Sequence, residues 1–109
     1  MAVETHSDYK YAVIDHAVSG DNTIVAAVTS AKLRVYSVFL LAAAAVTVRF
    51  ESGAGGTALT GQIQLPAQGG FVLPFNAAGW FETTAGALLN LELSAAVSID
   101  GCLTYGEIS

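Results

Sequence analysis

The feature of this sequence that most limits its fold is an uncharged run of fourteen residues, from Val35 to Val48, within VYSVFLLAAAAVTVRF. A transmembrane helix needs about 20 consecutive apolar residues. The run lies between Arg34 and Arg49 and is too short for such a helix, and the rest of the sequence offers no second candidate. We therefore expect no membrane-spanning helix and no membrane partner.

Two strands explain the run better than a buried helix does. Its alanines and leucines favour a helix, but KLRV before it and VTVRF after it alternate between apolar and polar residues with a period of two. Such alternation, together with β-branched residues, is typical of strands. We predict strands at about residues 32–41 and 45–51, joined near residues 42–45.

The first of these strands contains four consecutive apolar residues, VFLL at positions 38–41, which indicates a strand that is covered on both faces. One face would lie in the core and the other against a neighbouring subunit. Val38 and Leu40 are therefore interface candidates, whichever of them faces outward. Charged residues make up 12% of the chain, compared with about 25% in typical domains. We expect the chain to form a dimer or trimer with itself, or to be covered by a partner.

Turn-forming sequences divide the rest of the chain into short strands. They are Asp21-Asn22 before TIVAAV, SGAGG at 52–56, PAQGG at 66–70, NAAG at 76–79 and Asp100-Gly101 between VSI and CLTY. Asp-Gly predicts a two-residue hairpin with Ile99 opposite Cys102, because type I′ turns need positive φ at both central positions. In ALLNLELS the leucines would face inward, and Asn90 and Glu92 outward.

This series of short strands without a long helix predicts an all-β, single-domain antiparallel β-sandwich. A jelly-roll-like sandwich is our first choice, and an immunoglobulin-like one is the alternative. At 109 residues the chain has the length of one domain. We assign residues 9–109 to the sandwich and residues 1–8, which lack strand patterning, to a flexible N-terminal arm.

The sequence contains no arrangement of residues that indicates an enzyme. We find no nucleophile with a base and an orienting residue, no phosphate-binding glycine loop and no histidine or cysteine spacing typical of a metal site. We therefore predict no catalysis, no cofactor and no metal. The net charge of −5 argues against nucleic-acid binding, which normally uses a basic patch.

Aromatic residues in two little-patterned segments are the other interface candidates. Tyr9 and Tyr11 follow the arm, and Trp80, Phe81 and Glu82 follow the NAAG turn. Two adjacent aromatic rings beside a carboxylate can also stack on a sugar and hydrogen-bond to it. A carbohydrate-binding module is therefore an alternative function, although the same rings could simply pack a loop against the sandwich or fill an interface.

Five blocks of sequence follow one another from Asn22 onward: NTIVAAV, KLRVYSVFLLAAAAVTVRFESGAGGTALTG, FVLPFN, GWFETTAGALLNLELSAAV and DGCLTYGEI. In this order they resemble a group of small bacteriophage virion proteins that decorate or cement the capsid, and they span about four-fifths of the chain. The resemblance implies a β-sandwich without catalytic activity that binds assembled coat protein. The expected partner is the major capsid protein, and the expected location is the capsid surface of a virion assembled in the host cytoplasm. A tail- or fibre-associated structural protein is the alternative within the same group.

Overall fold

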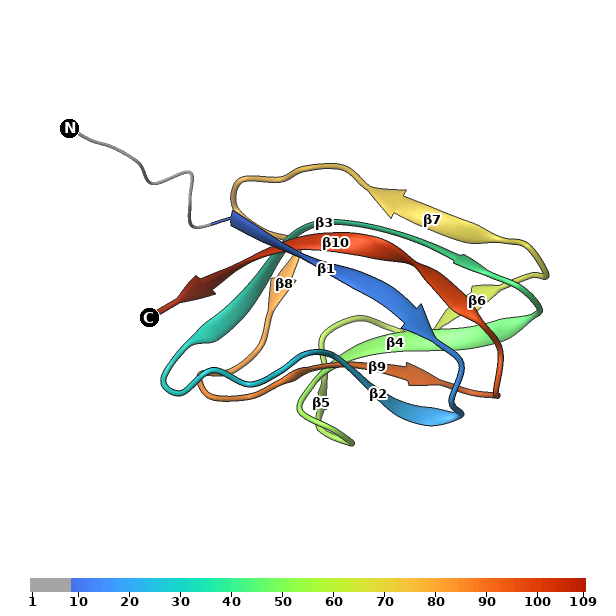
Figure 1. The fold of residues 1–109 in the computed structure, drawn as a ribbon, viewed down its shortest axis with the longest axis horizontal. Coiled ribbons are helices and arrows are strands. Elements are labelled where there is room, and N and C mark those ends of the chain that lie inside the picture. Colours follow the sequence, from blue (N-terminus) through green and yellow to red (C-terminus); the bar gives the residue numbers. More distant parts are fainter. Residues whose placement is uncertain (1–8) are drawn as a thin grey trace.

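A computed structural model describes residues 9–109, which form ten β-strands and no helix. The strands build two antiparallel sheets that pack face to face as a β-sandwich (Figure 1), and this confirms the predicted all-β class. Their bounds are β1 (Tyr9–His16), β2 (Gly20–Val25), β3 (Lys32–Ala42), β4 (Val46–Ser52), β5 (Thr57–Ala58), β6 (Ile63–Leu65), β7 (Gly70–Leu73), β8 (Phe81–Glu82), β9 (Leu89–Leu93) and β10 (Ile99–Ile108).

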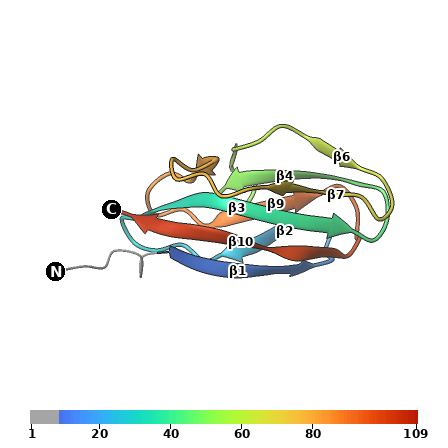
Figure 2. The ribbon, with the colours of Figure 1, turned by 90° about the horizontal axis from the view of Figure 1, so that it is seen from above.

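The two sheets each mix strands from the beginning and the end of the chain. Sheet A has the order β1-β10-β3-β7, and β8 also pairs with β3; sheet B has the order β2-β9-β4-β5, and β6 also pairs with β4 (Figure 2). The uncharged run forms β3 and β4, as predicted. Because these two strands belong to different sheets, residues 43–45 carry the chain from one layer to the other.

A β-bulge in β3 decides which of its residues face the core. Ser37 pairs with Thr104 and Val35 with Tyr105, which leaves Tyr36 as an extra residue in β3. An extra residue shifts the alternation of side chains by one position. Residues 33 and 35 therefore point into the core before the bulge, and residues 38, 40 and 42 do so after it.

The bulge makes one of our interface predictions wrong. Val38 and Leu40 are each only 2% exposed and lie in the core, whereas Phe39 and Leu41 are 53% and 54% exposed on the outer face of sheet A. The strand does have an apolar outward face, but Phe39 and Leu41 form it. A sequence pattern that is apolar at four consecutive positions does not reveal which pair is buried.

Apolar side chains from both sheets fill the space between the layers. The predicted inward leucines Leu89, Leu91 and Leu93 are all buried there, together with Phe50 from β4 and Leu103 from β10. Burying one large apolar side chain stabilises the folded state by about 1.5–3 kcal/mol. This core is therefore the main source of the protein's stability. No disulfide contributes, since Cys102 is free.

The predicted hairpin at Asp100-Gly101 is wrong. β10 runs without a break from Ile99 to Ile108, and Ile99 pairs with Ala42 and His16 instead of Cys102. A Cβ on Gly101 would lie 2.0 Å from the backbone oxygen of Phe39. The glycine is therefore needed for the close approach of β10 to β3 and not for a turn.

Other turn predictions have mixed outcomes. The PAQGG and NAAG turns are confirmed, since the Gly69 N–H donates to the Pro66 carbonyl and the Gly79 N–H to the Asn76 carbonyl. Asp21-Asn22 is not a turn, because both residues lie inside β2. The predicted arm, residues 1–8, lies outside the described residues.

Candidate functional site

The outer face of sheet A, the face turned away from sheet B, gathers most of the exposed apolar side chains of residues 9–109. The large apolar residues that remain exposed are Tyr9, Tyr11, Val13, Val18, Phe39, Leu41, Val72, Phe75 and Trp80. All except Val18 belong to sheet A or to the segment between β7 and β8. Scattered exposed apolar residues are normal, but a contiguous group on one face marks an interaction site.

A row of apolar residues crosses this face from one edge to the other. Val13 pairs with Cys102, Cys102 with Phe39, and Phe39 with Val72, so that four neighbouring strands each contribute one side chain. Opposed side chains on one face of a sheet lie in contact. The row is therefore a continuous apolar stripe across β1, β10, β3 and β7.

Aromatic rings extend the stripe along the strands. The Tyr9 ring meets those of Tyr36 and Phe75 edge to face, with centroids 5.0 and 5.6 Å apart, and Tyr36 stacks on Phe75 at 5.8 Å. Tyr36 is the bulge residue, and its ring lies over Gly106, where a Cβ would come within 3.0 Å of it. Of the predicted interface residues, Tyr9 is fixed in this cluster and Tyr11 is largely exposed beside it.

Trp80 and Phe81 do not form a common exposed platform. Trp80 is 42% exposed, and its indole N–H donates to the Pro74 carbonyl at 2.8 Å. Phe81 instead packs against the core, with its ring 5.0 Å from that of Phe50. The two rings therefore do not form the side-by-side platform of the carbohydrate-binding alternative, and Trp80 alone of the two presents its ring to solvent.

Glu82 is held by two cations on sheet A. Its carboxylate lies 2.8 Å from Arg34 Nε and 3.5 Å from Lys32 Nζ. The hydrogen bond from Arg34 lowers the pKa of Glu82 below its ordinary value, with a further contribution from the Lys32 charge. Glu82 thus fixes β8 to β3 and leaves little of its charge for a ligand.

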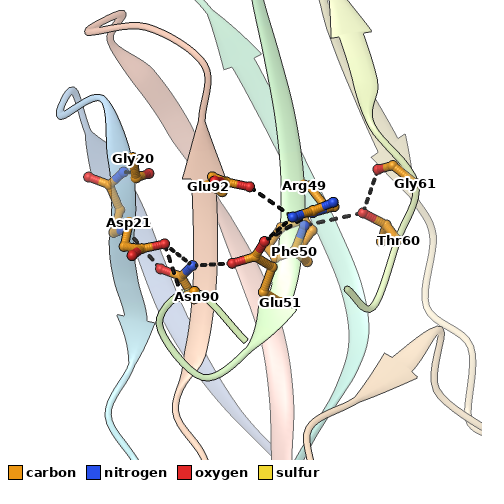
Figure 3. A network of polar contacts seen from close by, with 11 residues as sticks. Gly20, Asp21, Arg49, Phe50, Glu51, Thr60, Gly61, Asn90 and Glu92 are labelled. Atoms are coloured by element: carbon orange, nitrogen blue, oxygen red, sulfur yellow. Dashed lines mark hydrogen bonds and ion pairs between the residues drawn. The ribbon is translucent and has the colours of Figure 1, made fainter. Parts of the chain in front are cut away.

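The outer face of sheet B is different in character, because it carries a network of polar side chains (Figure 3). Glu51, only 1% exposed, accepts hydrogen bonds from Arg49 and from the Asn90 side chain. Asn90 is also buried and donates to Asp21 at 2.8 Å, and Arg49 reaches Glu92 at 3.1 Å.

This network joins three strands and a loop. Asp21, Asn90 and Glu51 come from β2, β9 and β4, and the N–H of Gly55 in the β4–β5 loop donates to Asp21 at 3.2 Å. Contact with Glu51 raises the pKa of Glu92, although Arg49 opposes the shift. Each of the buried polar groups Glu51 and Asn90 has a partner, so the network serves to hold the sheet and the loop together.

Neither face of residues 9–109 brings together three or more histidine, cysteine or acidic side chains in a way that could hold a metal ion. The same residues form no helix with the length and hydropathy to span a membrane. Comparison of the chain with protein-family models, curated proteins and solved structures found no match.

Sequence reasoning identified the apolar strand but missed most of the residues that form its exposed surface. Val13, Val72 and Phe75 come from three separate segments, and only the strand order brings them next to Phe39. Within β1 and β7, Val13 and Val72 alternate with more buried neighbours, but the sequence there is apolar at consecutive positions, so this alternation is visible only in the structure. The alternation shows that two faces exist, but it does not show which residues of different strands become neighbours.

Proposed function

We propose that this chain is a structural protein of a bacteriophage virion that binds the outer surface of the assembled capsid. It would stabilise the shell by non-covalent contacts between coat subunits, as a decoration or cement protein does. The observation that carries the proposal is the apolar outer face of sheet A, because contiguous exposed apolar side chains of this kind often mark a surface that binds a partner. The five sequence blocks that resemble capsid-decorating proteins supply the kind of partner.

The proposed partner is the major capsid protein, and the proposed location is the capsid surface of a virion assembled in the host cytoplasm. A protein surface suits this chain better than nucleic acid, because the net charge of −5 would be repelled by phosphates. The role needs no catalysis and no cofactor. Trp80, which is 42% exposed, is our candidate for direct contact with the shell, since tryptophan is one of the residues enriched among those that dominate the binding energy of interfaces.

The strand order supports a jelly-roll type of sandwich within this proposal. The pairings β1 with β10, β2 with β9, β3 with β7 and β8, and β4 with β5 and β6 are nested, as if one long hairpin were wrapped into two layers. An immunoglobulin-like sandwich instead places its first two strands side by side in one sheet. In this chain β1 and β2 belong to different sheets.

Two alternatives remain distinguishable by experiment. A tail- or fibre-associated structural protein would use the same apolar face against a different virion partner. A carbohydrate-binding module has weaker support, because Phe81 packs on Phe50 and leaves Trp80 without the adjacent ring.

The test is binding of the purified chain to shells that lack it. Emptied shells and dissociated coat subunits are each mixed with the chain and sedimented, and the bound chain is quantified. We expect saturable binding to shells, a fixed ratio to coat protein at saturation, and an increase in the temperature at which shells disassemble. Binding to isolated tails alone would favour the tail alternative. A thermal shift with soluble glycans, without binding to shells, would favour the sugar module.

A further inference from the structure

Counted over residues 9–109, the two ends of the outer face of sheet A carry opposite net charge. At the basic end, Lys32 and Arg34 share the single carboxylate of Glu82, which leaves one positive charge in excess. Lys10 and Glu107, at the same end, neutralise each other at 3.3 Å. The excess charge lies at the ends of β3 and β8, on one side of the apolar stripe.

The acidic end contains an unfavourable pair. Asp15 and Asp100 lie directly opposite each other on β1 and β10, and both are exposed. Neither forms an ion pair with another residue of the described chain, 9–109. Like charges directly opposite each other destabilise a pair of strands, so a cation from outside the chain would relieve the repulsion.

We infer that the outer face of sheet A binds the same face of a second copy across a two-fold axis, with the strands of the two copies antiparallel. In this arrangement Asp15 and Asp100 of each copy lie opposite Lys32 and Arg34 of the other. A second copy supplies both the complementary charge and a matching apolar stripe, as a self-complementary interface requires. Packed sheets commonly cross at about 30°, and such a crossing brings the acidic corner at β1 and β10 toward the basic corner at β3.

The size of the face is sufficient for a specific dimer. Four strands about 4.8 Å apart, with the eight-residue length of β1 at about 3.4 Å per residue, cover about 500 Å². Two such faces together cover about 1,000 Å², the lower limit for a specific interface. Aromatic rings project from the face at Tyr9, Tyr11, Phe39 and Phe75, which increases the area beyond this flat footprint.

The test is the association state of the full chain at micromolar concentration, measured by sedimentation velocity. The wild type should be a dimer that weakens as salt is added, because its charged ends attract. Asp100→Lys has two opposite effects. Within one copy, the new positive charge lies opposite Asp15 and removes the repulsion between the two aspartates. Across the interface, the same charge faces the basic end of the partner and is repelled by it. We expect its dimer dissociation constant to rise at least about tenfold while its melting temperature does not fall.

Two further variants decide the orientation. Lys32→Glu should weaken the dimer in the same way, and the double variant Asp100→Lys/Lys32→Glu should return toward wild-type affinity, because positions 100 and 32 of facing copies again carry opposite charges. Gln62→Lys/Gln64→Lys is the matched control, since it changes the net charge as much as Asp100→Lys does but lies at exposed positions in and beside β6 of sheet B. Its dimer should be unaffected.

Three results would overturn the inference. A wild type that is monomeric at these concentrations would mean that another partner, such as coat protein, covers the face. A trimer would exclude the two-fold axis. Stronger association of Asp100→Lys than of the wild type would show that like ends of the two copies face each other. The inference does not depend on binding to a shell. It assigns the outer face of sheet A to a second copy, so a dimer that also binds shells would do so through other surfaces, with Trp80 in the segment between β7 and β8 as the candidate contact.

Discussion

Glu51 and Glu92 lie close together on the outer face of sheet B, yet their surroundings differ. Glu51 is buried and accepts hydrogen bonds from Arg49 and Asn90, whereas Glu92 is partly exposed and has Arg49 as its cation. The sequence predicts an outward position for both Asn90 and Glu92. Asn90 does lie on the outer side, but the polar network buries it. Alternation in one strand gives the side of the sheet and contains no information about what covers it.

The two glutamates should respond oppositely to loss of charge. Glu51→Gln should lower the free energy of unfolding by about 2 kcal/mol, because one of its two buried acceptor oxygens is replaced by an amide that cannot accept from Arg49 or Asn90. Glu92→Gln keeps an acceptor for Arg49 and removes repulsion from Glu51, so it should be neutral or slightly stabilising, by less than about 1 kcal/mol at this partly exposed site. Urea denaturation at neutral pH measures both.

The effect of Glu92→Gln on stability should depend on pH, because the pKa of Glu92 in the wild type is raised by its contact with Glu51. The folded state holds the Glu92 proton to higher pH than the unfolded chain does, so this group's contribution to stability falls as pH rises above about 4.3. The variant should therefore gain stability relative to the wild type between pH 4 and pH 7. An equal difference at both pH values would contradict the arrangement of Glu51 and Glu92 described above.

At the scale of the strand, the bulge at Tyr36 is the feature that the sequence does not reveal. The alternation predicted for KLRV is present, with Leu33 and Val35 facing the core, but one extra residue exchanges the faces of everything that follows in β3. The existence of the two strands, their alternation with a period of two and the position of the connection near residues 42–45 depend on local sequence. These features were therefore predictable. Register depends on the partner strand β10, which is more than fifty residues away in the sequence.

Adjacent residues of β3 should therefore differ sharply in their tolerance of lysine. Phe39→Lys replaces an exposed ring and should leave the melting temperature within a few degrees of the wild type, while it abolishes self-association. Val38→Lys buries an unpaired ammonium in the core and should prevent folding, because such burial costs more than about 4 kcal/mol. Circular dichroism with sedimentation velocity measures both effects. If Phe39→Lys unfolds as Val38→Lys does, the assigned faces of β3 are wrong.

The glycine of Asp100-Gly101 tests the register between β10 and β3. Gly101→Ala should lower the free energy of unfolding by about 1–3 kcal/mol, because its methyl group would overlap the Phe39 carbonyl and push the strands apart. Gly61→Ala is the matched control, since a Cβ there meets no atom within 4 Å. Chemical denaturation compares the two. Equal stability of Gly101→Ala and the control would support the hairpin that the sequence suggested.

At the scale of the whole molecule, the two outer faces differ in chemical character. Sheet B carries a satisfied polar network, and sheet A carries an apolar stripe with a basic and an acidic end. The low content of charge predicted that some surface would be covered, and the β-sandwich class was predictable from short strands and turns. The position of that surface was not predictable from the sequence. Only the nested strand order makes neighbours of the residues that form it, Val13, Cys102, Phe39 and Val72.

Trp80 is the side chain that we expect to anchor the chain on the shell. Trp80→Ala should weaken occupancy on shells by about 30-fold, which corresponds to about 2 kcal/mol for the loss of an aromatic anchor. Trp80→Phe is the control, since it keeps an exposed ring but loses the hydrogen bond to the Pro74 carbonyl. The occupancy of Trp80→Phe on shells should fall less than that of Trp80→Ala. Normal occupancy of Trp80→Ala with a much lower melting temperature would make Trp80 a structural residue instead.

The central proposal is that the chain belongs to the capsid of a bacteriophage virion, and the most direct measurement is its abundance in purified particles of a phage whose genome contains its gene. Particles are purified by density gradient, heads and tails are separated, and the chain and the major capsid protein are quantified by mass spectrometry. We predict that the chain copurifies with heads in a fixed ratio to the major capsid protein across preparations. Its absence from particles, or its presence only in the tail fraction, would contradict the claim.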